Sequence, residues 1–210
     1  MRTLSSRLIV VTDRHQTNGR PLVPLLQLVL AAAGPAIQIR EHDLSAGELV
    51  ALVGEVQAVT APRRCQLLIN DRIDVALARE GVGVHLRSNS LPVPIARQLL
   101  GAERLLGISV HSVEEAMQAE SQGADYIILG PIYETPSKQS FGPPLGIHTL
   151  EKACRLVRTP IVGIGGVTKA RVSEMLDAGA FGVAVIRAIL GAADVESATR
   201  ELIDAVTPVS

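Results

Sequence analysis

The sequence of 210 residues is poor in aromatic side chains, which make up 2% of the residues, and it has no tryptophan. A core without large rings must be built from aliphatic side chains, as in a sheet that helices cover on both faces. The chain has only two cysteines, Cys65 and Cys154. This low number suits buried thiols in a reducing cytosol.

The sequence also lacks an excess of one charge and a long hydrophobic run. The net charge is -1 at pH 7, which argues against nucleic acid or an anionic membrane as the main partner, since both normally require a basic surface. The first apolar run, Leu8 to Val11, is soon broken by Asp13 and Arg14, so it is too short for a secretory signal or a membrane span. We therefore expect a soluble cytoplasmic protein, and we leave open whether it forms a homo-oligomer.

Short apolar runs alternate with helical patterns eight times along the chain. We predict strands over 8–12, 36–40, 66–69, 82–86, 105–109, the run after Gly123, 161–164 and 181–186. Intervening helices include 22–33, 45–59, 71–79, 150–157 and 168–178, with capping boxes at Ser45–Glu48 and Ser112–Glu115. Such alternation requires right-handed parallel crossovers, and eight units predict a (β/α)8 TIM barrel as a single domain over residues 1–210. Periodicity alone leaves open a doubly wound sheet.

In such a barrel, the chemically active groups lie where strands end and the following loops begin. Arginine and lysine side chains at this rim neutralise phosphate charge, and glycine N–H groups at a helix start donate to phosphate oxygens. The pattern favours a small phosphorylated ligand. The candidate residues are Gln38, Arg40, Asn70, Asp71, Ser109, His111, Thr135, Ser137, Lys138, Gly165, Gly166, Ile186 and Arg187.

Some of these residues also have a purely structural interpretation. Asn70 and Asp71 fit a helix N-cap, and His85, within an apolar run, fits a packed strand residue. His111 precedes a capping box, where the helix dipole disfavours a charged imidazole and leaves the ring able to accept a proton. The loop over 131–144 is long for a compact domain, which is typical of a lid or binding loop.

Ordered motifs along nearly the whole chain resemble the thiamine phosphate synthase and thiazole tautomerase (TenI) superfamily of barrels. They include Val11-Thr12-Asp13-Arg14, Gln38-Ile39-Arg40-Glu41, Ile69-Asn70-Asp71-Arg72, Gly83-Val84-His85-Leu86, Ser109-Val110-His111-Ser112, Gly123 to Lys138 and Ile164-Gly165-Gly166-Val167. The resemblance implies a phosphorylated thiazole as the ligand. It implies phosphate binding by Gly165, Gly166, Ile186 and Arg187, and substrate binding by Gln38, Arg40, Asn70, Ser109, Thr135, Ser137 and Lys138.

The two branches of this superfamily differ in diphosphate chemistry. A synthase joins a pyrimidine methyl diphosphate to the thiazole phosphate, and its pattern has a lysine and a second magnesium-binding aspartate where this chain has His42 and Ser90. Only Asp71 remains as a metal ligand, whereas Mg²⁺ on a diphosphate relies on one or two carboxylates.

We therefore predict a metal-independent thiazole tautomerase, an isomerase without a cofactor in which His111 is the acid/base. A synthase that uses Mg²⁺ held by Asp71 is the first alternative. The second is a non-catalytic barrel that binds a thiazole or thiamine phosphate.

Overall fold

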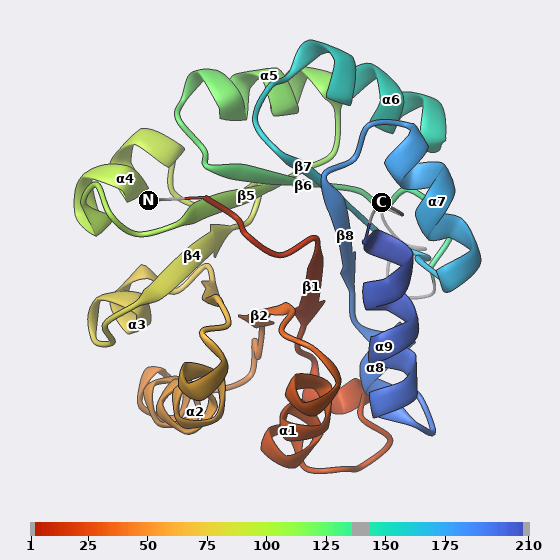
Figure 1. Ribbon diagram of the computed structural model, residues 1–210. Coiled ribbons are helices and arrows are strands. Elements are labelled where there is room, and N and C mark those ends of the chain that lie inside the picture. The colour runs from red at the N-terminus through yellow and green to blue at the C-terminus, as the bar shows by residue number, and fades with distance from the viewer. Residues whose placement is uncertain (1–2, 136–142, 208–210) are drawn as a thin grey trace.

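The computed structural model describes residues 3–135 and 143–207. Its centre is a closed barrel in which each strand pairs in parallel with the next and β8 pairs with β1 (Figure 1). The strands are β1 (Leu8–Val11), β2 (Ala36–Ile39), β3 (Leu67–Asn70), β4 (Val82–Leu86), β5 (Leu106–Val110), β6 (Tyr126–Leu129), β7 (Ile161–Ile164) and β8 (Gly182–Val185). The prediction of a TIM barrel is confirmed, and the doubly wound alternative is excluded.

Helices surround the barrel, most of them between consecutive strands in the chain and two after the last strand (Figure 1). They are α1 (Leu22–Ala32), α2 (Ala46–Thr60), α3 (Ile73–Leu77), α4 (Val93–Leu100), α5 (Val113–Ser121), α6 (Ile147–Leu156), α7 (Lys169–Asp177), α8 (Arg187–Leu190) and α9 (Val195–Val206), with short 3₁₀ turns η1 (Arg14–Gln16) and η2 (Ala61–Arg63). Within the described ranges, none of them has the length and apolar character that crossing a membrane requires.

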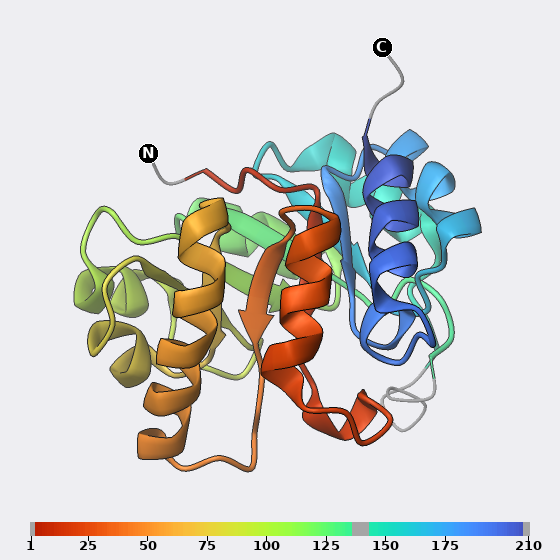
Figure 2. The same ribbon diagram turned by 60° about the horizontal axis from the view of Figure 1, so that its bottom comes forward.

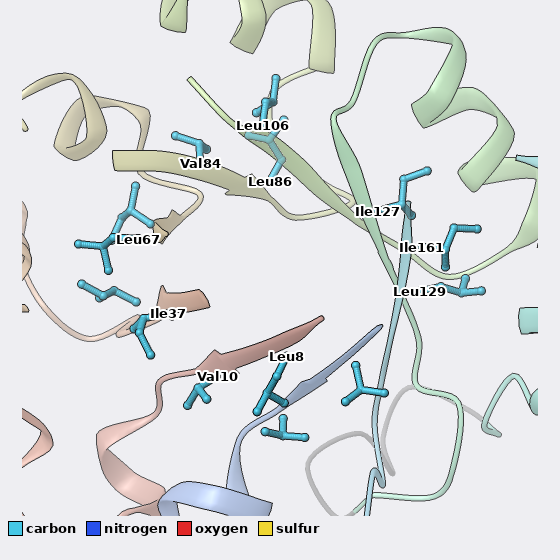
Figure 3. Packing of buried hydrophobic residues seen from close by; sticks show 14 of the residues in the cluster. Leu8, Val10, Ile37, Leu67, Val84, Leu86, Leu106, Ile127, Leu129 and Ile161 are labelled. Atoms are coloured by element: carbon cyan, nitrogen blue, oxygen red, sulfur yellow. The ribbon is translucent and has the colours of Figure 1, made fainter. Parts of the chain in front are cut away.

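Strand side chains alternate between two apolar layers. Outward-facing residues such as Leu67, Val84 and Ile127 pack between the strands and the helices (Figure 3). The residues between them face the barrel interior, where Leu68 and Ile128 belong to a second, smaller cluster. Both layers are mainly aliphatic, as the lack of aromatic residues predicts, because a sheet covered by helices buries both of its faces; the interior cluster also includes the ring of Tyr126.

Of the two predicted capping boxes, one is confirmed and the other is altered, and one helix begins later than predicted. Ser45 and Glu48 form the expected capping box at α2. At α5, the Ser112 hydroxyl accepts from the N–H of Glu115, but the Glu115 carboxylate accepts from the N–H of His111 instead of that of Ser112. Helix α3 begins at Ile73, later than predicted, because Asp71 has a left-handed backbone conformation, with φ of 63°.

The two ends of the barrel differ, because the chain termini lie at one end and the loops that follow the strands lie at the other (Figure 2). Both termini lie at the end where the strands begin, whereas the strands point toward the opposite end (Figure 2). The loops that follow the strands gather there, and this end is the expected position of the site.

Candidate active site

Polar side chains fill one half of the barrel interior near the ends of the strands. Gln38 on β2 is 2% exposed and donates through Nε2 to Oδ1 of Asn70 on β3, at 3.1 Å. Asn70 pairs in register with His85 on β4, and His85 contacts Ser109 on β5. The structure therefore brings three of the predicted substrate-binding residues, Gln38, Asn70 and Ser109, into one buried polar layer.

His85 is the centre of this layer. It is 1% exposed, and its ring lies between the hydroxyls of Tyr126 and Ser109, at 2.9 Å from Nδ1 and 2.8 Å from Nε2. Burial lowers the pKa of His85 to about 3, because a charged imidazole is strongly disfavoured away from water. The prediction that His85 is a packed, hydrogen-bonded strand residue is confirmed.

Asp71 follows β3, and one of its two carboxylate oxygens has no hydrogen-bond partner among the described residues. Its N–H donates to the carbonyl of His85 at 2.9 Å, and its Oδ2 accepts from Arg87, at 2.7 Å from Nε and 2.6 Å from the second guanidinium nitrogen. The other oxygen, Oδ1, is buried and has no hydrogen-bond partner among the described residues, and the same is true of Oε1 of Gln38. Buried polar atoms are normally paired, so both atoms are candidates for ligand contacts.

The structural interpretation of Asn70 and Asp71 as a helix N-cap is wrong. The residue that caps α3 is Arg72, and the helix has no side-chain cap hydrogen bond. Asn70 is instead oriented by Gln38, and Asp71 by Arg87.

Arg40 and His42 add positive groups to the same part of the rim. Burial lowers the pKa of the Arg40 guanidinium, while the nearby carboxylates of Asp13 and Glu41 oppose that shift. Burial also lowers the pKa of His42, and the charges of Arg40 and Arg87 lower it further. Two guanidinium groups therefore lie close enough to interact, an arrangement that an anionic ligand stabilises.

His111 stands at the start of α5 and is exposed. Its Nδ1 lies 2.6 Å from the carbonyl oxygen of Gly130, which can only accept, so Nδ1 carries the hydrogen and Nε2 is available to a ligand. This contact ties the loop after β5 to the end of β6.

The Gly165–Gly166 turn after β7 packs closely against the loop that follows β6. Both glycines have positive φ, 97° and 62°, and an added Cβ at Gly165 would lie 2.5 Å from Cβ of Pro131. The N–H of Tyr133 donates to the carbonyl of Gly165 at 3.2 Å, and Arg171 donates to that of Gly166 at 2.6 Å. Glycine is therefore required at both positions by backbone conformation and by close approach.

The remaining predicted site residues lie around this turn or outside the described residues. Ile186 is half-buried and packs against the interior cluster, whereas Arg187 at the start of α8 is exposed. Thr135 is half-buried in the loop after β6. Ser137 and Lys138 fall outside the described residues.

Sequence reasoning missed the two residues that orient predicted site residues. Arg87 falls in the segment 85–90 that the sequence places at the rim, but no binding role was predicted for it, although it lies two residues beyond His85 and the strand alternation points it to the same side. Tyr126 was treated as part of an apolar strand, yet its hydroxyl contacts His85 inside the barrel. Alternation along β4 and β6 is the signal that could have identified both.

A magnesium site built by protein side chains alone is not present in the part of the chain that the structure describes, since no cluster of three or more His, Cys, Asp or Glu side chains occurs there. The unpaired Oδ1 of Asp71 nevertheless fits one ligand of a hard cation. Mg²⁺ is commonly held by one or two carboxylates together with substrate phosphates and water. The donor set fits a metal shared with a phosphorylated substrate.

Comparisons with known proteins identify the family of this chain. Residues 8–189 match the family model described as thiamine monophosphate synthase. The chain is 44% identical over 200 residues to the thiamine-phosphate synthase of Moorella thermoacetica, covering 95% of each chain. It is 42% identical over 195 residues to that of Roseiflexus castenholzii, covering 93% of this chain and 86% of the relative. The solved thiamine phosphate pyrophosphorylase of Pyrococcus furiosus superposes with a TM-score of 0.87 at 34% identity, covering 95% of each chain.

These relatives contradict the prediction of a thiazole tautomerase, and with it the isomerase class and the closer relation to the tautomerase branch. The prediction counted the charges missing at His42 and Ser90 but did not count the guanidinium of Arg87, in the same loop as Ser90, as a charge that can bind diphosphate. It also gave too much weight to the loss of one carboxylate, because one can suffice when the substrate supplies phosphate ligands. Superfamily membership itself is confirmed, and the chain belongs to the thiamine monophosphate synthase family.

Proposed function

We propose that this chain is a magnesium-dependent thiamine-phosphate synthase, which joins a pyrimidine methyl diphosphate to a thiazole phosphate and releases pyrophosphate. The observation that carries the proposal is the unpaired, buried Oδ1 of Asp71 beside the guanidinium groups of Arg87 and Arg40. A carboxylate oxygen without a partner suits a cation, and two guanidinium groups suit the diphosphate that this cation accompanies.

At the diphosphate end, Arg40 and Arg87 bind the phosphate oxygens, and Asp71 with Asn70 would hold Mg²⁺. When bound, the metal neutralises charge on the diphosphate and makes it a better leaving group. The two arginines act in the same direction, because their charge stabilises the pyrophosphate as its bond to the pyrimidine methylene carbon breaks. His42 lies beside them with a pKa lowered by burial and by both arginines, so it contributes a neutral hydrogen-bonding group near pH 7.

The barrel interior suits a flat ring with one polar edge. Gln38 and Ser109 lie in the polar layer and bind that edge, while Ile128 and Ile186 belong to the apolar cluster against which a ring face packs. Held there, the methylene carbon faces the thiazole nitrogen, which forms the new carbon–nitrogen bond as the carbon–oxygen bond to diphosphate breaks. Positioning two reactants in this way accounts for a large part of the barrier reduction in such reactions.

At the thiazole end, the N–H groups of the Gly165–Gly166 turn bind the phosphate, which is a recurrent use of the loops after the seventh and eighth strands in this fold. Ile186 borders the same end of the barrel, and Arg187 and Lys138 supply further positive charge. Thr135 and Ser137 bind substrate from the loop after β6. His111 offers Nε2 to the substrate as a hydrogen-bonding group, because joining the two rings requires no acid/base at this position.

The test is release of pyrophosphate from the two substrates, measured with Mg²⁺ and again in EDTA. We expect release that depends on the metal, and Asp71→Asn should lower kcat/KM on the order of 100-fold or more, since a catalytic metal supplies several kcal/mol of charge stabilisation.

Asp74→Asn is the matched control, because Asp74 is an exposed neighbour whose carboxylate pairs with Arg72 and not with Arg87. Its kcat/KM should stay within about twofold of the parent. Ligand binding without pyrophosphate release would refute the proposal and leave a non-catalytic barrel.

A further inference from the structure

A buried chain of three hydrogen-bonding side chains crosses three neighbouring strands inside the barrel. It runs from Tyr126 on β6 through His85 on β4 to Ser109 on β5, with 2.9 Å between the phenol oxygen and Nδ1 and 2.8 Å between Nε2 and Oγ. Gly107, which lies between them on β5, makes the arrangement possible, because a Cβ there would lie 2.1 Å from Cζ of Tyr126. The first two members are fully buried, and Ser109, near the end of its strand, reaches the proposed substrate site.

The positions of the hydrogens in this chain follow from burial. Tyr126 is 0% exposed, and burial raises its pKa well above the ordinary value, so the phenol keeps its hydrogen. Its one hydrogen-bond partner among the described residues is Nδ1 of His85. A buried O–H group requires an acceptor, so Tyr126 donates and Nδ1 accepts.

The state of His85 then determines what Ser109 can do. The ring is neutral, because Nδ1 accepts the hydrogen of Tyr126 and therefore carries none of its own. A neutral imidazole whose Nδ1 accepts carries its single hydrogen on Nε2. That hydrogen is donated to Oγ of Ser109, and the hydroxyl hydrogen of Ser109 is left to point away from His85.

We propose that Tyr126 and His85 are positioning residues that make Ser109 an obligatory hydrogen-bond donor to an acceptor atom of the bound pyrimidine substrate. The opposite tautomer would make Nε2 an acceptor and draw the Ser109 hydrogen away from the substrate. This inference rests on the proposed function for the identity of the substrate. The direction of the hydrogen bonds depends on the protein alone.

The first test determines the tautomer of His85 in the protein without ligand. In protein labelled with ¹⁵N at histidine, long-range ¹H–¹⁵N correlation spectra distinguish a protonated Nε2 from a protonated Nδ1, and His85→Gln identifies the signal. We expect hydrogen on Nε2 and a neutral ring from pH 5 to pH 8. Hydrogen on Nδ1, or a ring that titrates in this range, overturns the inference while leaving the synthase proposal intact.

The second test is a double-mutant cycle on the dissociation constant for the pyrimidine methyl diphosphate, measured by calorimetry with Mg²⁺. Loss of one neutral hydrogen bond predicts that Tyr126→Phe and Ser109→Ala each weaken binding about 5- to 10-fold. If Tyr126 acts through Ser109, Tyr126→Phe should change binding less than about twofold once Ser109→Ala is present.

Tyr133→Phe is the matched control, because it removes the same hydroxyl from the other tyrosine, which donates to Glu174 instead. Its effect should be equal with and without Ser109→Ala. Additive effects of Tyr126→Phe and Ser109→Ala would mean a merely structural role and overturn the inference. A parent protein that does not bind the diphosphate would refute the proposed function and this inference together.

Discussion

Gly165→Ala tests whether the turn after β7 is held against the loop after β6 as tightly as the distances indicate. The substitution has two costs. An alanine at φ of 97° adopts a backbone conformation that L side chains disfavour by about 1–2 kcal/mol. Its Cβ would also lie 2.5 Å from Cβ and 2.7 Å from Cα of Pro131, and overpacking of this kind costs about 1–3 kcal/mol. The sum is a loss of about 2–5 kcal/mol in the free energy of unfolding.

Gly123→Ala separates the two costs. Gly123 also has positive φ, 87°, but an added Cβ there meets no atom within 4 Å. It follows α5, where its N–H donates to the carbonyl of Glu120 at the helix end. This variant should therefore lose only the conformational cost of about 1–2 kcal/mol, and the difference between the two variants isolates the overlap with Pro131.

The assay is unfolding in urea, monitored by circular dichroism. The dependence of the unfolding free energy on urea concentration must be the same in all variants before their midpoints are converted to free energies. We expect Gly165→Ala to be less stable than Gly123→Ala by about 1–3 kcal/mol. A difference below about 0.5 kcal/mol would mean that Pro131 moves aside without cost, and the argument for a rigid phosphate-binding turn would fail. Binding of inorganic phosphate, measured on both folded variants, should weaken only for Gly165→Ala.

Three further substitutions test the buried polar groups and the interior packing. Because the pKa of His85 is about 3 when folded and 6.5 when unfolded, its stabilising contribution is complete above pH 6.5 and is lost as pH falls. Between pH 7 and pH 5 the parent should lose about 2 kcal/mol in urea unfolding that His85→Gln does not lose. Arg97→Met removes the ion pair with Asp125, at 2.6 Å, while the N–H of Leu106 still donates to the same carboxylate oxygen, and should cost about 1.5–3 kcal/mol by the same assay. Gly107→Ala, which overlaps the ring of Tyr126, should lower the thermal midpoint, and the double variant with Tyr126→Leu should recover part of the loss.

Local patterns in the sequence predicted the eight strand–helix units of the barrel. Eight apolar runs separated by helical patterns indicate parallel strands that are buried on both faces and joined by right-handed crossovers. The pairing of β8 with β1, which closes the sheet and excludes the doubly wound alternative, is visible only in the tertiary structure. Capping residues such as Ser45 and Glu48 act within one helical turn, so their contacts follow from spacing. The start of α3 was misplaced, because the left-handed conformation of Asp71 depends on its N–H reaching the carbonyl of His85 on another strand.

The same distinction applies to the site. The sequence determined which side chains reach the end of the barrel, since each candidate stands where a strand ends. It did not determine their partners: Asp71 pairs with Arg87 from the next loop, and Ser109 contacts a histidine from a different strand. These pairs depend on the register of neighbouring strands, which is a property of the closed barrel. The same packing leaves Oδ1 of Asp71 unpaired. The sequence alone therefore indicated missing charge at positions 42 and 90. The tertiary structure decided that Arg87 pairs with the carboxylate of Asp71. Charges that are distant in sequence interact only when the strands that carry them are neighbours, as β3 and β4 are in the closed barrel.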